Sequence, residues 1–166
     1  APITIAYDFN AWAQCTAVSP LRFQKHQHPL AQATHPMTIL VAYVPRPEGQ
    51  AALDKGIEIA KRRNERLLVV NATTGGAKDE GAMASVQDVE RIEAQLKEAG
   101  VLSEFKQFGR GKSAIEEIEA LVTALQPYVL VIGLRKRSAV GKLILGSVAQ
   151  EILMSVDCPV LCVKAH

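Results

Sequence analysis

Short apolar runs and amphipathic segments alternate along the chain from residue 37 onward. Three runs are almost wholly apolar: TILVAYV at 38–44, RLLVVNA at 66–72 and YVLVIG at 128–133. Such runs are typical of strands that are covered on both faces in a parallel sheet. The segment 101–108, VLSEFKQF, is more polar and suits a sheet edge, and 159–164, PVLCVK, begins with a proline that an edge strand tolerates. The pattern therefore predicts five strands.

Amphipathic helical patterns separate these strands. Ser113 and Glu116 have the spacing of a capping box, in which each side chain pairs with the other residue's backbone N–H, and Gly100 stands where a helix should stop. The predicted helices begin after Pro47 and cover 85–99, 113–126 and 147–156.

Strict alternation of strands and helices defines the fold class. It predicts an α/β protein with an open, doubly wound, five-stranded parallel sheet, right-handed crossovers and helices on both faces. In such sheets ligands gather beyond the carboxyl ends of the strands, at the point where the strand order reverses. Candidate site residues are therefore sought where the strands end.

The first 36 residues have a different character from the rest. They hold half of the eight prolines, the only tryptophan and three of the four histidines, without sustained periodicity. We expect residues 1–36 to form an irregular N-terminal extension and residues 37–166 to form the folded domain. His26, His28 and His35 lack a further ligand at a telling spacing, so no metal site is predicted.

Composition narrows the possible partners. The net charge of +2 over 166 residues provides no broad field for nucleic acid or membrane surfaces, so neither is expected as a partner. Three cysteines without a C-x-x-C pair fit reduced thiols, and no apolar run approaches the roughly 18 to 20 residues of a membrane span. We expect a cytoplasmic protein.

The segment 133–147, GLRKRSAVGKLILGS, carries four positive charges and no negative one. It follows a predicted strand, opens a predicted helix and has twelve residues between Gly133 and Gly146. Free backbone N–H groups at a helix start, together with the helix dipole, favour a bound phosphate. Ser147 and Gln150 also match a capping box, so helix capping alone and capping combined with a phosphate contact both remain open.

Other apparent motifs do not indicate chemistry. GRGKSA at 109–114 contains the GKS of a P-loop, but the earlier glycine that such a loop requires would fall at Lys106. No serine or cysteine has a recognisable base, and no paired carboxylates mark the strand ends, so no catalytic residue is predicted.

The domain from 37 to 166 resembles a universal stress protein. ILVAYVPRPEGQAAL is similar to the family's first strand and helix start, and residues 129–164 resemble its C-terminal signature. The family pattern of glycine, two residues, glycine, nine residues, glycine and serine or threonine falls on Gly133, Lys136, Gly146 and Ser147. The resemblance implies strand order 3-2-1-4-5, a Rossmann-like fold of the adenine nucleotide alpha hydrolase type, and homodimers paired through the last strand.

The resemblance also implies a nucleotide site, with ATP or alternatively AMP as the ligand. Two departures bear on it. Lys136 replaces the second glycine, and Val44 stands where ATP-binding members have an aspartate that contacts the adenosine part. The contacts carried over by motif are Ala42, Tyr43, Val44, Ala72, Ile132, Gly133, Arg135, Gly146, Ser147 and Val148.

Two functions follow as hypotheses. The first is a stress-response protein that binds an adenine nucleotide as a regulatory ligand. The second is a dimeric interaction module of the same family that has lost nucleotide binding. An ATP hydrolase or nucleotidyl-transfer enzyme is disfavoured, because metal-binding acids and a nucleophile are not evident in the sequence.

Overall fold

A computed structural model describes residues 37–73, 81–109, 112–136, 143–144 and 146–165. The predictions for residues 1–36, and the cations Arg137 and Lys142, lie outside these residues. Within them the main sheet is parallel, with the strand order β3-β2-β1-β4 and with β6 beside β4. Counting the parallel strands in chain order gives 3-2-1-4-5, which confirms the predicted fold class.

The parallel strands are β1 (Thr38–Ala42), β2 (Arg66–Ala72), β3 (Ser103–Phe108), β4 (Val129–Lys136) and β6 (Val160–Lys164). The helices are α1 (Pro47–Arg63), α2 (Val86–Ala99), α3 (Ala114–Leu125) and α4 (Ser147–Ser155). Each of these elements corresponds to a predicted segment, with ends that differ by at most two residues except that β4 runs three residues beyond the predicted end at 133.

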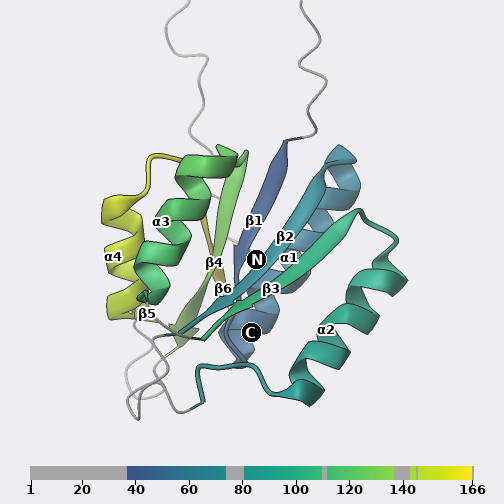
Figure 1. The fold of residues 1–166 in the computed structure, drawn as a ribbon, viewed down its shortest axis with the longest axis horizontal. Helices are drawn as coiled ribbons and strands as arrows, with labels where there is room; N and C mark the ends of the chain where they lie inside the picture. The colour runs from purple at the N-terminus through teal and green to yellow at the C-terminus, as the bar shows by residue number, and fades with distance from the viewer. Residues whose placement is uncertain (1–36, 74–80, 110–111, 137–142, 145, 166) are drawn as a thin grey trace, which may run out of the picture. The chain divides into compact units, whose positions relative to one another are not determined.

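Two hydrophobic cores sandwich the sheet, because side chains alternate between its faces. One core joins Ile39, Val41 and Val69 to α1 and α2, and the other joins Leu40 and Val70 to α3 and α4. Figure 1 shows the two pairs of helices on opposite sides of the strands. The central strands are therefore buried on both faces, as their continuous apolar runs predict.

One short element is absent from the sequence prediction. Leu143–Ile144 form β5, which pairs in antiparallel fashion with Arg135 and Lys136 at the end of β4. The apolar run predicts that the fourth strand ends at Gly133, but β4 continues to Lys136, and Leu143–Ile144 pair with its end. Two residues are too few to produce a recognisable strand pattern, which is why the sequence did not reveal this hairpin.

Candidate functional site

The site predicted from the sequence falls at the carboxyl edge of the sheet, beside the two central strands. Ala42 at the end of β1 pairs with Ile132 of β4 on one side and with Val70 of β2 on the other. The strand order reverses between β1 and β4, because β2 follows β1 outward in one direction and β4 lies on its opposite side. The structure therefore brings the predicted contacts of β1, β2 and β4 together at one switch point.

Helix α4 begins at this edge with an uncapped first turn. Gly146 is the N-cap residue, and no side chain forms a capping hydrogen bond there. Ser147 is the first helical residue, so the predicted capping box between Ser147 and Gln150 is wrong. Glycine can occupy the N-cap position but has no side-chain oxygen to offer. Within the described residues, the N–H groups of Ser147, Val148 and Ala149 have no hydrogen-bond acceptor.

The other three described helices have first turns of a different kind. Both α2 and α3 carry complete capping boxes, formed by Ser85 with Asp88 and by Ser113 with Glu116. Helix α1 has no capping side chain, but Glu48 lies in its first turn and complements the helix dipole. Helix α4 has neither a capping side chain nor an acidic residue in its first turn. Its start is therefore the most favourable place for an anion among these four helices.

The two glycines of the motif have different surroundings. A Cβ atom on Gly133 would lie 2.1 Å from the carbonyl oxygen of Glu48, so this glycine allows the first turn of α1 to pack closely on β4. A Cβ atom on Gly146 would have no neighbour within 4 Å among the residues described, and its φ of −64° suits any residue. Packing therefore explains Gly133, whereas it gives no reason for a glycine at position 146.

Arg135 is a cation near the end of β4, at this edge of the sheet. Its Nε lies 3.9 Å from Oε1 of Glu48, and its side chain is 56 % exposed. An ion pair at this distance contributes little, because water screens the exposed guanidinium, although the Glu48 side chain is only 13 % exposed. The guanidinium therefore remains available to a phosphate at small cost.

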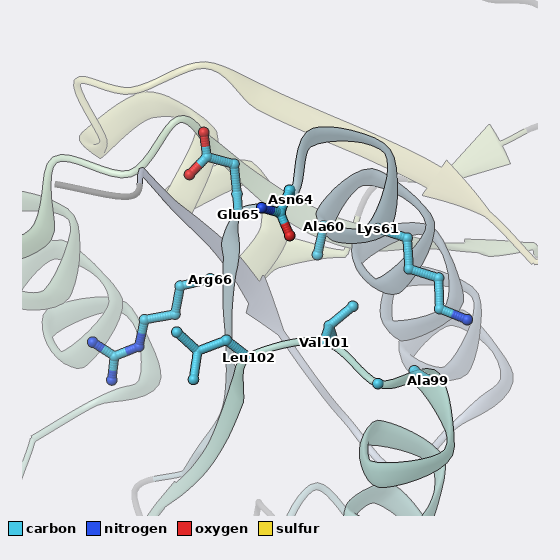
Figure 2. Close-up of a pocket in the computed structure, with 9 residues that line it drawn as sticks. Ala60, Lys61, Asn64, Glu65, Arg66, Ala99, Val101 and Leu102 are labelled. Atoms are coloured by element: carbon cyan, nitrogen blue, oxygen red, sulfur yellow. The ribbon is translucent and has the colours of Figure 1, made fainter. Parts of the chain in front are cut away.

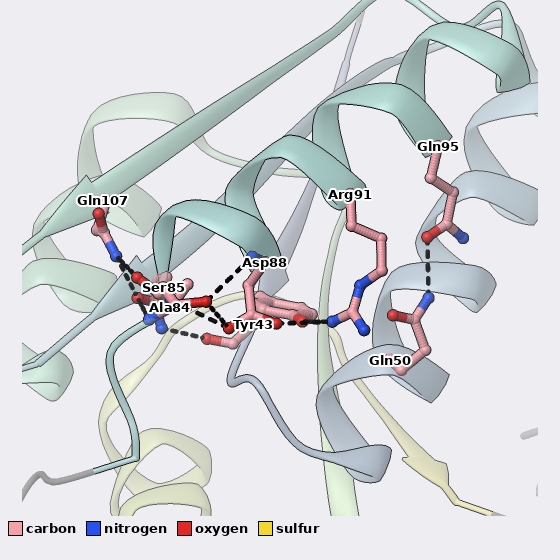
Figure 3. A network of polar contacts seen from close by, with 9 residues as sticks. Tyr43, Gln50, Ala84, Ser85, Asp88, Arg91, Gln95 and Gln107 are labelled. Atoms are coloured by element: carbon pink, nitrogen blue, oxygen red, sulfur yellow. Dashed lines mark hydrogen bonds and ion pairs between the residues drawn. The ribbon is translucent and has the colours of Figure 1, made fainter.

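Tyr43, another predicted contact, is buried in the protein interior. It is 2 % exposed, its N–H donates to the carbonyl of Val70 at 2.7 Å, and its own carbonyl accepts from Asn71 Nδ2 at 3.0 Å. Arg91 Nη2 donates to its hydroxyl at 3.3 Å, as Figure 3 shows. Burial raises the pKa of this phenol, which therefore stays protonated at neutral pH.

Asn71 is a buried residue that the sequence analysis did not single out. Its Nδ2 donates to the carbonyls of Tyr43 and Ala82, and its Oδ1 accepts from the N–H of Ala84 and from Nε2 of Gln107. One amide thus joins the ends of β1, β2 and β3 to the residues that lead into α2. The feature of the sequence that could have revealed this role is the polar residue within the apolar run RLLVVNA.

The remaining predicted contacts are exposed or half-buried, apart from the buried Ile132. Val148 is 47 % exposed, and Gly146 and Ser147 are exposed beside it. Ala42, Val44 and Ala72 are half-buried at their strand ends, whereas the side chain of Ile132 belongs to the core of α3 and α4. Contacts from Ile132 and Tyr43 to a ligand are therefore limited to the backbone.

A separate pocket of about 330 Å³ lies at the opposite edge of the sheet. Figure 2 shows it between the end of α1, the end of α2 and the first residues of β2, with Ala60, Lys61, Arg66 and Val101 in its wall. None of the predicted contacts lines it. The pocket and the predicted site are therefore distinct.

The described residues contain neither a metal-binding cluster nor a membrane-spanning helix. No group of three or more His, Cys, Asp or Glu side chains is placed to hold a metal ion there. No helix in the described part of the chain is both long enough and apolar enough to cross a membrane. His26, His28 and His35 lie outside the residues that the structure describes.

The fold defines a doubly wound α/β protein whose predicted site lies at the switch point of the sheet. A model of the universal stress protein family matches residues 36–164. A universal stress protein of Mycolicibacterium smegmatis is 45% identical over 128 residues, which cover 77% of this chain and 98% of the relative. This chain belongs to the universal stress protein family.

Solved structures with the same fold include proteins with bound nucleotides. A universal stress protein from Archaeoglobus fulgidus is 25% identical, with a TM-score of 0.61 and coverage of 78% of this chain and 99% of that one. The A. fulgidus protein in complex with dAMP is 22% identical, with a TM-score of 0.60 over 78% and 98% of the two chains. An Arabidopsis thaliana family member with AMP bound is 19% identical, with a TM-score of 0.57 over 79% and 93%.

Proposed function

We propose that this protein binds an adenine nucleotide at the start of α4 and uses it as a regulatory ligand in a cytoplasmic stress response. ATP is the proposed ligand and AMP the alternative. The observation that carries the proposal is the first turn of α4, which has no capping side chain and no acidic residue. Backbone N–H groups in such a turn hydrogen-bond phosphate oxygens, and the helix dipole adds attraction.

The residues around this turn fit the phosphate end of a nucleotide. Gly146 leaves open space where a larger residue would place its side chain, and Arg135 adds a positive charge from β4. The relatives solved with dAMP and AMP share the fold and support the choice of an adenine ligand.

Val44 sets the expected strength of binding. It replaces a carboxylate with an apolar side chain near the end of β1, and the loss of one hydrogen bond typically weakens binding by about 0.5 to 1.5 kcal/mol. We therefore expect affinity reduced by about tenfold relative to a member with aspartate there. Regulation further requires that the nucleotide bind two conformations or assemblies with different affinity.

The test is calorimetric titration of the full chain with ATP and AMP, after any copurified nucleotide has been removed and identified by mass spectrometry. Gly146→Val places a branched side chain where phosphate is proposed to lie. We expect at least a tenfold loss of affinity, about 1.4 kcal/mol. Undiminished binding by this variant means that the site lies elsewhere. If the wild-type protein binds neither ATP nor AMP, the proposal is wrong.

Gly146→Ser is a sharper companion variant. Its hydroxyl would cap α4 and raise the free energy of unfolding by a few tenths of a kcal/mol. The same hydroxyl would occupy N–H groups that phosphate needs, so nucleotide affinity should fall. Opposite effects on stability and on binding separate a blocked site from a damaged fold.

A second candidate function, the dimeric interaction module, is favoured by the edge formed by β6. Within the described sheet β6 pairs only with β4, and Leu161 and Cys162 are exposed on it. Pro159 directs its carbonyl toward Leu130 of β4. Backbone groups alternate in direction along a strand, so those of Val160, Cys162 and Lys164 point toward the unpaired edge.

Antiparallel pairing of two such edges about a two-fold axis overlaps the strands best when Cys162 lies opposite its own copy. We expect Cys162→Glu to place two like charges together and convert the dimer to a monomer in sedimentation velocity. Met154→Glu is the matched control, because Met154 is highly exposed on α4. A dimer that survives Cys162→Glu contradicts this interface, and a dimer without nucleotide binding favours the module over the regulator.

A further inference from the structure

We draw no further inference here: the strongest candidate, the pocket of about 330 Å³ between the ends of α1 and α2, combines the Lys61 side chain with two helix C-termini, which favour ligands of opposite charge, and nothing in the structure shows what occupies it.

Discussion

Helices α3 and α4 pack beside each other on one face of the sheet and both begin at its carboxyl edge, but their first turns differ. In α3 the Ser113 hydroxyl accepts from the N–H of Glu116, and the Glu116 carboxylate accepts from the N–H of Ser113. In α4 the N-cap residue is Gly146, and no side chain caps the turn. The difference separates amides that a side chain of the protein caps from amides that no described side chain caps.

The same division extends along the carboxyl edge. Asn71, Ser85 with Asp88 and Ser113 with Glu116 form a closed part, in which buried or terminal polar groups are paired by the protein. Gly146–Ala149 form an open part. Substitutions in the closed part should change stability, and substitutions in the open part should change binding.

The largest effect is expected at Asn71. Asn71→Ala leaves the N–H of Ala84 and the carbonyl of Tyr43 without their buried partner and opens a cavity. We expect the free energy of unfolding to fall by about 2 to 4 kcal/mol in urea titrations. Gln95→Ala is the control: Gln95 bonds Gln50 and Asp54 near the surface, and its loss should cost less than about 0.5 kcal/mol. Similar losses in the two variants would contradict the special position of Asn71.

A smaller effect is expected at the capped start of α3. Ser113→Ala removes the capping oxygen and should lower the free energy of unfolding by about 1 kcal/mol. Nucleotide affinity should be unchanged, because this turn belongs to the closed part. If Ser113→Ala lost as much nucleotide affinity as Gly146→Val, the ligand would bind at the start of α3 instead of α4. That result would contradict our account.

The smallest expected effect is a loss of stability at low pH. The backbone N–H of Ser113 lowers the pKa of Glu116, and the Ser85 hydroxyl lowers the pKa of Asp88. Because both folded-state pKa values lie below those of the unfolded chain, their stabilisation is present at neutral pH and is lost as pH falls through the folded values. Thermal unfolding between about pH 6 and about pH 3 should show a smaller acid-dependent decrease in Tm for Glu116→Gln than for wild type. An identical decrease would mean that the capping carboxylate does not contribute.

The fold was predictable because its information is local. The apolar runs 38–44, 66–72 and 128–133 marked the buried central strands, and the Ser113–Glu116 spacing marked the start of α3. The hairpin with β5 was not predictable, because a two-residue strand has no periodicity. Strict βα alternation then restricted the topology to a doubly wound sheet.

The candidate site was only partly predictable. Sequence spacing identified Gly146 but attributed a capping box to Ser147, since spacing alone does not reveal which residue is the N-cap. The close approach of Glu48 to Gly133 and the four hydrogen bonds of Asn71 depend on contacts between distant segments.

The most direct measurement of the central claim is the response of individual backbone amides to nucleotide. In ¹⁵N–¹H spectra of the full chain titrated with ATP or AMP, the amides of Ser147, Val148 and Ala149 should shift and saturate together. Those of Ala114, Ile115 and Glu116, in the capped turn of α3, should remain in place. Saturable nucleotide binding that leaves the first turn of α4 unmoved would contradict the account.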